Sequence, residues 1–135
     1  MKYQYLYIAS LLLLLSCSSD DDENSKPDLN LLGTWQLTSF YSDPGDGSGD
    51  FEPINSSKTV TFKLNSEINS NADLCTLFSE VGMPSTGTYS KNDGTISITD
   101  CNNQPVSLFY DLSEGVLTLS YLCFEACQEK YKKVN

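Results

Sequence analysis

The chain contains neither histidine nor arginine, and only 8 of its 135 residues are lysine. Without histidine it lacks the usual general base at neutral pH and the commonest transition-metal ligand, which removes most enzyme templates. The 18 aspartate and glutamate residues give a formal net charge of −10. A chain this acidic has no basic surface to neutralise phosphates, which argues against nucleic acid as a partner. We therefore predict no enzymatic activity, no cofactor and no nucleic-acid partner.

The N-terminal apolar run is also short. It extends from Ile8 to Leu15, whereas a membrane-spanning helix needs about 20 apolar residues. Lys2 precedes the run and supplies a positive charge, which is the order of regions in a secretory signal peptide. A polar segment follows. This arrangement predicts a signal peptide rather than a transmembrane helix.

The run closes on Leu14-Leu15-Ser16-Cys17, which resembles the lipobox of bacterial lipoproteins. The resemblance implies that residues 1–16 are a signal peptide cut off before Cys17. It also implies that Cys17 carries two or three acyl chains, such as palmitate, which give stable attachment to a membrane. An ordinary secretory signal and an uncleaved apolar anchor are the alternatives.

Residues 17–30 have the composition of a tether. Four consecutive carboxylates, 20–23, repel one another, so the segment is predicted to be solvated and extended. An acidic run directly behind a lipidated cysteine resembles the surface-export signal of Bacteroidetes lipoproteins. This resemblance implies an outer-membrane protein displayed at the cell surface, and the alternative is the periplasmic leaflet.

Four cysteines remain after Cys17, namely Cys75, Cys101, Cys123 and Cys127. An even number in an exported chain favours disulfides, because the compartment is oxidising. Zinc ligation is the alternative, but the spacings contain no CxxC pair. Three pairings are possible. A bridge across the three residues between Cys123 and Cys127 is feasible, and it would leave Cys75 for Cys101.

Residues 31–135 are predicted to form one domain with a single core. Short runs of alternating polar and apolar residues are separated by turn residues, and there is no helical period of any length. Lys-Asn-Asp-Gly at 91–94 is a strong hairpin signal. The predicted strands are 33–41, 59–64, 87–90, 95–99, 106–112, 116–122 and 128–134.

One segment, 66–77, is ambiguous. Asn71 could cap a short helix over 72–80, or the segment could be a strand that carries Cys75. Seven or eight strands indicate an all-β, antiparallel up-and-down meander, and closing it into a small barrel would remove the exposed sheet edges. Alternation within the strands is expected to point these side chains inward: Trp35, Leu37, Val60, Phe62 and Leu64.

Leu32-Gly33-Thr34-Trp35, at the start of the domain, looks like the G-x-W opening of lipocalin-like barrels. Together with Gly87-Thr88-Tyr89 and with the Cys123–Cys127 pair before Lys130-Tyr131-Lys132, it resembles the small lipocalin-like lipoproteins of Bacteroidetes. The resemblance implies that Gly33 permits a close approach and that Trp35 plugs the closed end under a basic side chain, often arginine. Because arginine is absent, Lys130 or Lys132 is expected over Trp35, in a contact of about 0.5–2 kcal/mol.

The loop 43–50 alternates carboxylates with glycines and is a candidate site. A flexible backbone lets oxygens converge on calcium, but the EF-hand pattern fails, because its twelfth position counted from Asp46 is Ser57. We therefore predict no metal, with calcium at Asp46 and Asp50 as the alternative. The loop could also act as a lid or a partner contact above the barrel mouth. The candidate residues are Asp43, Asp46, Ser48 and Asp50.

The family resemblance implies that the barrel mouth binds a small apolar or amphipathic ligand. The alternative is a structural or interaction protein with a packed barrel, such as an accessory subunit of an outer-membrane complex or a protease inhibitor. The two differ in free volume, and a cavity of about 300 Å³ or more favours ligand carriage. The side chains expected to fill the barrel are Trp35, Phe62, Tyr89, Ile98, Tyr110 and Tyr121.

Overall fold

The computed structural model describes residues 30–77, 80–102, 104–124 and 126–135. The predicted signal peptide, Cys17 and nearly all of the tether lie outside the described residues. Within them the chain forms nine strands. The strands are β1 (Gly33–Ser42), β2 (Asp50–Pro53), β3 (Thr59–Phe62), β4 (Glu67–Ala72), β5 (Val81–Ser90), β6 (Thr95–Cys101), β7 (Gln104–Ser113), β8 (Val116–Tyr121) and β9 (Cys127–Lys133).

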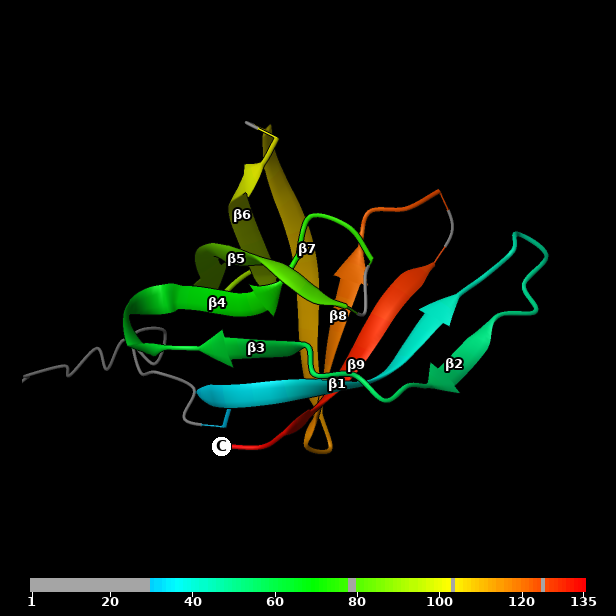
Figure 1. Cartoon of the computed structure of the whole chain (residues 1–135), viewed down its shortest axis with the longest axis horizontal. Coiled ribbons are helices and arrows are strands. Elements are labelled where there is room, and N and C mark those ends of the chain that lie inside the picture. The colour runs from blue at the N-terminus through cyan, green and yellow to red at the C-terminus, as the bar shows by residue number, and fades with distance from the viewer. Residues whose placement is uncertain (1–29, 78–79, 103, 125) are drawn as a thin grey trace, which may run out of the picture.

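Eight of the nine strands close into an antiparallel barrel (Figure 1). Strands β3 to β9 follow one another as neighbours, and β1 pairs with both β3 and β9 to complete the ring. Closure leaves no open edge in this ring, which is how all-β domains avoid edge-to-edge association. The all-β barrel of about eight strands predicted from the sequence is therefore confirmed. The buried residues of the core cluster all lie between Leu31 and Tyr131, so residues 31–131 share one hydrophobic core.

The ninth strand, β2, was not predicted. It pairs only with the second half of β1, from Ser39 to Ser42, while β3 pairs with the first half. A register shift in β1 between Leu37 and Ser39 separates the two halves, and the segment 54–58 runs past this irregularity. In Figure 1 the β1–β2 hairpin extends beyond the ring. Two acidic residues and a proline mark β2 as an exposed edge strand.

The structure differs from the predicted strands in several places, and β5 begins at Val81 rather than at Gly87. Leu64 was expected inward but is 58% exposed, because β3 ends at Phe62 and residues 64–66 form a 3₁₀ turn that reverses the chain. The ambiguous segment 66–77 contains β4, and Cys75 lies in the connection that follows it. The described residues between 72 and 80 contain no helix.

The barrel interior is filled by its own side chains. Trp35, Leu37, Val60 and Phe62 are buried as predicted, because residues two apart on a strand face the same side. Phe62 contacts the rings of Tyr89 and Tyr110 edge-on. The other members of the core cluster include Leu31, Ile68, Leu74, Ile96, Ile98, Leu108, Leu117, Leu119, Tyr121 and Tyr131.

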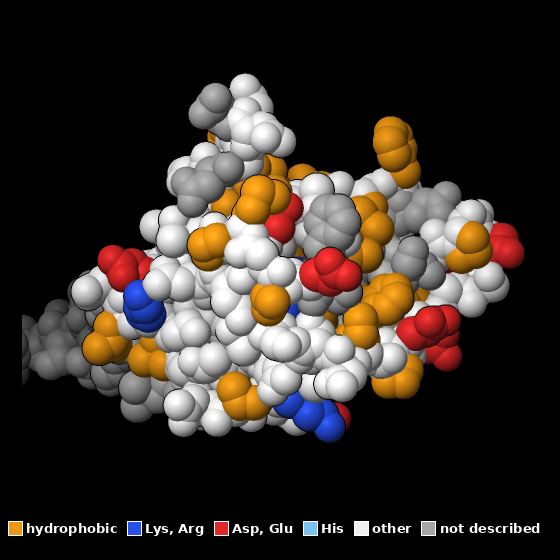
Figure 2. Space-filling view, viewed as in Figure 1, with side chains coloured by type: hydrophobic (Ala, Val, Ile, Leu, Met, Phe, Trp, Pro, Cys, Tyr) orange, Lys and Arg blue, Asp and Glu red, His pale blue; other side chains and the backbone are white. Residues whose placement is uncertain are grey.

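The two ends of the barrel differ in their exposed charge. The closed end carries the turns 63–66, 91–94 and 114–115 and the end of β9, and both lysines and carboxylates lie there. The mouth, formed by the described connections 43–49, 73–77 and 122–124, carries aspartates and no lysine. Figure 2 shows acidic side chains over the β1–β2 hairpin, and an apolar side chain at the tip of the β8–β9 connection.

Candidate functional site

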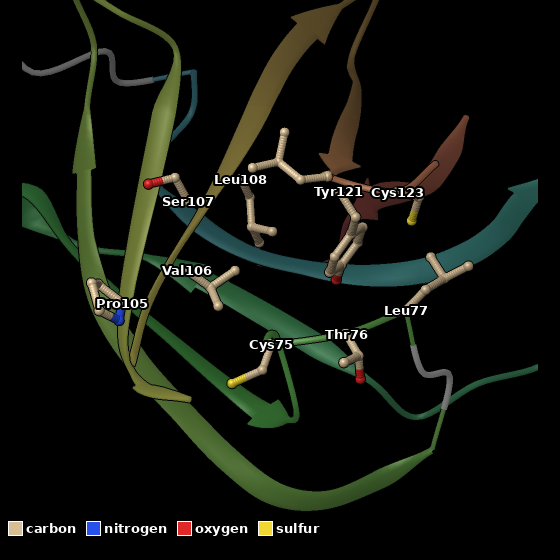
Figure 3. Close-up of a pocket in the computed structure, with 10 residues that line it drawn as sticks. Cys75, Thr76, Leu77, Pro105, Val106, Ser107, Leu108, Tyr121 and Cys123 are labelled. Carbon is tan, nitrogen blue, oxygen red and sulfur yellow. The ribbon is translucent and has the colours of Figure 1, made fainter. Parts of the chain in front are cut away.

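A pocket of about 430 Å³ opens at the mouth between β7, the end of β8 and the connection after β4. Figure 3 shows Val106 and Leu108 of β7 directed toward Tyr121, with Leu77 and Thr76 across from them. Leu108 and Tyr121 form the inner wall, since they are 0% and 8% exposed. Apolar walls with a few polar groups are typical of small-molecule sites. The lining residues are Cys75, Thr76, Leu77, Pro105, Val106, Ser107, Leu108, Tyr121, Leu122 and Cys123.

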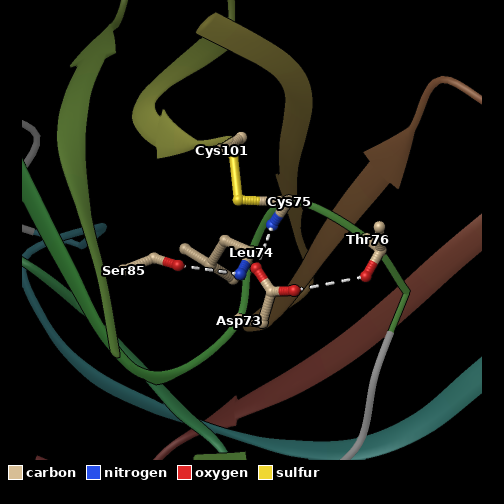
Figure 4. Close-up of a disulfide and its surroundings, with 6 residues drawn as sticks. All are labelled: Asp73, Leu74, Cys75, Thr76, Ser85 and Cys101. Carbon is tan, nitrogen blue, oxygen red and sulfur yellow. Dashed lines mark hydrogen bonds between the residues drawn. A yellow bond between two sulfur atoms is a disulfide. The ribbon is translucent and has the colours of Figure 1, made fainter. Parts of the chain in front are cut away.

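Two disulfides hold the connections that border the pocket. Cys75 pairs with Cys101 at the end of β6, with Cα atoms 5.4 Å apart, and Cys123 pairs with Cys127 across the β8–β9 connection. The first bridge attaches the connection after β4 to the barrel wall (Figure 4). The prediction of disulfides rather than zinc is confirmed, since a thiol in a disulfide cannot ligate a metal as a thiolate.

A buried polar cluster lies beneath the pocket, and it was not predicted. The Lys58 ammonium donates to both carboxylate oxygens of Glu129, at 2.8 and 3.0 Å, with the two side chains 0% and 1% exposed. The hydroxyls of Tyr121 and Tyr131 donate to Glu129 Oε2 at 2.7 and 2.5 Å. Tyr121 therefore joins the pocket wall to this ion pair. We name Lys58, Glu129, Tyr121 and Tyr131 the buried polar cluster.

Strand alternation explains how two charged residues came to lie inside. Lys58 precedes Val60 and Phe62 at a spacing of two, and Glu129 precedes Tyr131 in the same way. Each charged side chain therefore shares the inward face of its apolar neighbours. Charged residues are usually assigned to the solvent face, so Lys58 and Glu129 were not predicted to be buried. The period of two alone would have placed both side chains in the interior.

Burial shifts the ionisation of this cluster. Desolvation lowers the pKa of Lys58, and the charge and hydrogen bonds of Glu129 act in the opposite direction. Desolvation also raises the pKa of Tyr121 and of Tyr131 well above 10, and the Glu129 charge adds to both shifts. Both phenols therefore remain neutral hydrogen-bond donors at physiological pH.

We expect Tyr121 and Tyr131 to resist ionisation until the barrel unfolds. Their folded pKa values exceed the ordinary value of 10, so above about pH 10 the unfolded chain binds fewer protons and stability falls as pH rises. Below about pH 10 this contribution is fully present. The lowered pKa of Lys58 has the opposite effect, because stability then rises with pH. This effect ends near pH 10.5, the ordinary pKa of lysine.

Absorbance at the tyrosinate band, followed together with circular dichroism from neutral to strongly alkaline pH, tests this expectation. The last ionisation step should coincide with loss of the β signal. Tyr121→Phe and Tyr131→Phe should each remove part of that late step. Ionisation of every tyrosine in a barrel that stays folded would contradict the assignment.

The closed end is built as the G-x-W resemblance implies, with one correction. Gly33 has a φ of +123°, and a Cβ there would collide with the carbonyl oxygen of Asn135. Trp35 is 1% exposed, and its indole N–H donates to the Leu31 carbonyl oxygen at 2.8 Å. The cation over its ring is Lys133, whose Nζ lies 5.4 Å from the ring centroid.

The expectation of Lys130 or Lys132 over Trp35 is therefore wrong. On β9 the inward face carries Glu129, Tyr131 and Lys133, so Lys130 and Lys132 have the opposite parity. The Lys130 ammonium lies instead 3.6 Å from the centroid of the Phe51 ring on β2. Because side chains two residues apart on a strand share a face, the inward-facing Tyr131 indicates Lys133 as the lysine over Trp35.

The candidate loop 43–50 is organised by its own backbone. The Asp43 carboxylate accepts hydrogen bonds from the N–H groups of Gly45 and Gly47 at 2.7 and 3.1 Å, and from the Tyr41 hydroxyl at 3.2 Å. These bonds, that of Gly45 first, lower the pKa of Asp43. Ser48 donates its N–H to Asp46 at 2.9 Å.

The carboxylates of this loop thus bind neighbouring amides. Asp50 accepts the N–H of Phe51 at 2.7 Å, so the loop does not direct Asp43, Asp46 and Asp50 at one point. Among the residues that the structure describes, no group of three histidine, cysteine, aspartate or glutamate side chains could hold a metal ion. The loop lies beside the mouth, because it follows Ser42 of β1, which pairs with Cys127. Cys127 is the first residue of β9, directly after the β8–β9 connection at the mouth.

A comparison with protein families agrees with this architecture. The family model of the lipocalin-like domain matches residues 31–119. The chain belongs to the lipocalin-like domain family. A crystal structure of a lipocalin-like protein from Bacteroides uniformis is 23% identical, covers 78% of this chain and 99% of its own, and superposes with a TM-score of 0.49. A search of curated proteins finds no match.

The lipocalin-like match begins just before Gly33 and ends within β8. Tyr121, Glu129 and Tyr131 lie beyond the matched residues, so the family match does not reach most of the buried polar cluster. In the described part of this lipocalin-like chain there is no helix long and apolar enough to cross a membrane.

Proposed function

We propose that this protein is a non-enzymatic, surface-anchored lipocalin-like lipoprotein that binds a small apolar or amphipathic ligand in the mouth pocket. The supporting observation is the pocket itself. Its volume of about 430 Å³ lies in the range of small-molecule sites, and Leu77, Val106 and Leu108 offer an apolar wall. Thr76 supplies a hydroxyl group that can orient a polar end.

Binding of 1-decanol to residues 18–135, followed by NMR chemical-shift titration, tests the proposal. We expect saturable shifts for Leu108 and Tyr121, because an alkyl chain gains from leaving water. Thr76→Trp should fill the pocket and weaken binding by at least about tenfold, which corresponds to about 1.4 kcal/mol. Thr88→Trp is the matched control, since Thr88 is an exposed residue of β5 outside the pocket. Unsaturable binding would overturn the proposal and favour the packed barrel that acts through its loops.

The same proposal includes an anchor. Residues 1–16 are removed, acyl chains on Cys17 hold the protein in the outer membrane, and the acidic run 20–23 directs it to the cell surface. The support is the order of the sequence: a charged start, a short apolar run, a small residue and a cysteine. Substitution of the cysteine removes the only thiol that can carry the lipid in this segment.

We expect Cys17→Ala to move the protein from the membrane fraction to the soluble fraction. Fractionation and immunoblotting would measure the shift. Ser18→Ala is the matched control and should leave the protein in the membrane fraction. Retention of the Cys17→Ala protein in carbonate-washed membranes would show that the anchor is an uncleaved apolar segment.

A further inference from the structure

The groups beneath the mouth pocket carry an excess of negative charge. The buried polar cluster contains one cation, Lys58, and one carboxylate, Glu129. Asp73, in the connection after β4, adds a second carboxylate that acts electrostatically on both Lys58 and Tyr121. One lysine against two carboxylates leaves one negative charge without compensation.

Asp73 lies beside the mouth pocket and lines an adjoining hollow of about 140 Å³, which shares Cys75 and Thr76 with that pocket. Its carboxylate accepts the N–H of Cys75 at 2.7 Å and the hydroxyl of Thr76 at 3.3 Å, and both of these residues line the pocket (Figure 4). The disulfide from Cys75 to Cys101 fixes the same connection to the barrel. The carboxylate is therefore positioned before a ligand arrives and needs little reorganisation.

No lysine balances this charge within the described lining. The segments 73–77, 104–108 and 121–124 that border the pocket contain no cationic residue. Lys130, a partly buried lysine of β9, has its ammonium over the ring of Phe51. The aspartates of the β1–β2 connection add further negative charge at the mouth.

The one lysine beneath the pocket is unsuited to an anionic ligand. The Lys58 ammonium is 0% exposed and is bound by both oxygens of Glu129. An incoming carboxylate or phosphate would have to displace Glu129, which also accepts the hydroxyls of Tyr121 and Tyr131. Leaving that carboxylate buried without its partner costs several kcal/mol.

We propose that the occupant of the mouth pocket is a cationic amphiphile, an apolar chain or ring that carries a protonated amine. The inference rests on the proposed function and names the ligand class of the same site. The apolar part lies against Leu77, Val106 and Leu108, and the ammonium approaches Asp73 and the hydroxyl of Thr76. Because Lys58 is already bound by Glu129, it offers no charge to the anionic counterpart.

Three probes with the same chain and different head groups test the proposal: decylamine, 1-decanol and decanoate. Calorimetric titration of residues 18–135 at pH 7 and low salt should give the order decylamine, decanol, decanoate, with at least about a tenfold difference between the charged probes. Added salt should reduce the difference, since exposed charges are screened. Equal affinity for all three probes would overturn the proposed charge preference but not the proposed binding site. Absence of binding by all three would overturn both the charge preference and the proposed function.

Asp73→Asn separates the specific charge from the general acidity of the chain. The amide keeps an acceptor for the Cys75 N–H, so we expect unchanged decanol affinity and about a tenfold loss of the preference for decylamine. Glu67→Gln is the matched control, because it removes one exposed charge from the first residue of β4, at the closed end. Equal effects of the two variants, or tighter binding of decanoate than of decylamine, would overturn the assignment.

Discussion

Replacement of Glu129 by glutamine is expected to lower the free energy of unfolding by about 3–5 kcal/mol. The variant keeps the shape and one acceptor for the tyrosine hydroxyls, but leaves the Lys58 ammonium buried without its counter-charge. Lys58 can respond only by releasing its proton. The destabilisation should therefore shrink as pH rises toward the ordinary lysine pKa of 10.5.

Denaturant unfolding of residues 18–135 at pH 7 and pH 9 measures this effect. The double variant Lys58→Met, Glu129→Gln is the decisive comparison, because it removes both charges and retains the volume. It should recover most of the lost stability, since paired removal of a buried ion pair is often nearly neutral. A loss below about 1 kcal/mol for Glu129→Gln would mean that water reaches the cluster.

Replacement of Trp35 by alanine should also cost about 3–5 kcal/mol. Trp35 is 1% exposed and heads the fully buried side chains by volume, so its removal leaves a large cavity at the closed end. The carbonyl of Leu31 would lose the indole N–H that it accepts. Thermal and denaturant unfolding would measure the loss, and a value under about 1 kcal/mol would show that the indole does not plug the barrel.

Two milder variants divide this effect into its parts. Trp35→Phe keeps most of the apolar volume and removes the N–H, so a smaller loss of about 1–2 kcal/mol is expected. Lys133→Ala should cost about 0.5–2 kcal/mol if the ammonium over the ring matters. Lys132→Ala is its control, because the neighbouring residue has the opposite parity on β9.

The barrel was predictable because its strands repeat with a period of two. Runs such as Val60–Phe62 and Leu117–Leu119 alternate cleanly with polar residues, and all four of these side chains are buried. The prediction was wrong where a strand stops early. Leu64 continues the alternating pattern, yet the chain reverses direction at 64–66. The position of this turn depends on where the pairing of β3 with β4 ends, at Phe62 and Ile68.

The site was harder to predict than the fold. Alternation assigns a face to each strand residue, but the pocket depends on a connection, 73–77, whose place is set by the bridge from Cys75 to Cys101. Lys58 and Glu129 are 71 residues apart, and neither suggests a partner until the barrel closes. Strand β2 is too short and too acidic to give a recognisable pattern.

The chain enters the barrel at the end opposite the pocket. The carbonyl of Asn30 accepts a hydrogen bond from the Lys133 ammonium at 2.9 Å, and Leu31 lies under Trp35. The segment that precedes residue 30 is therefore attached to the barrel at its closed end. Thirteen residues, 17–29, span at most about 45 Å when extended, and in the proposed anchored form the attachment and the mouth lie at opposite ends of the barrel. The mouth therefore opens away from the point of attachment, and an occupant has a route into it from the surrounding water.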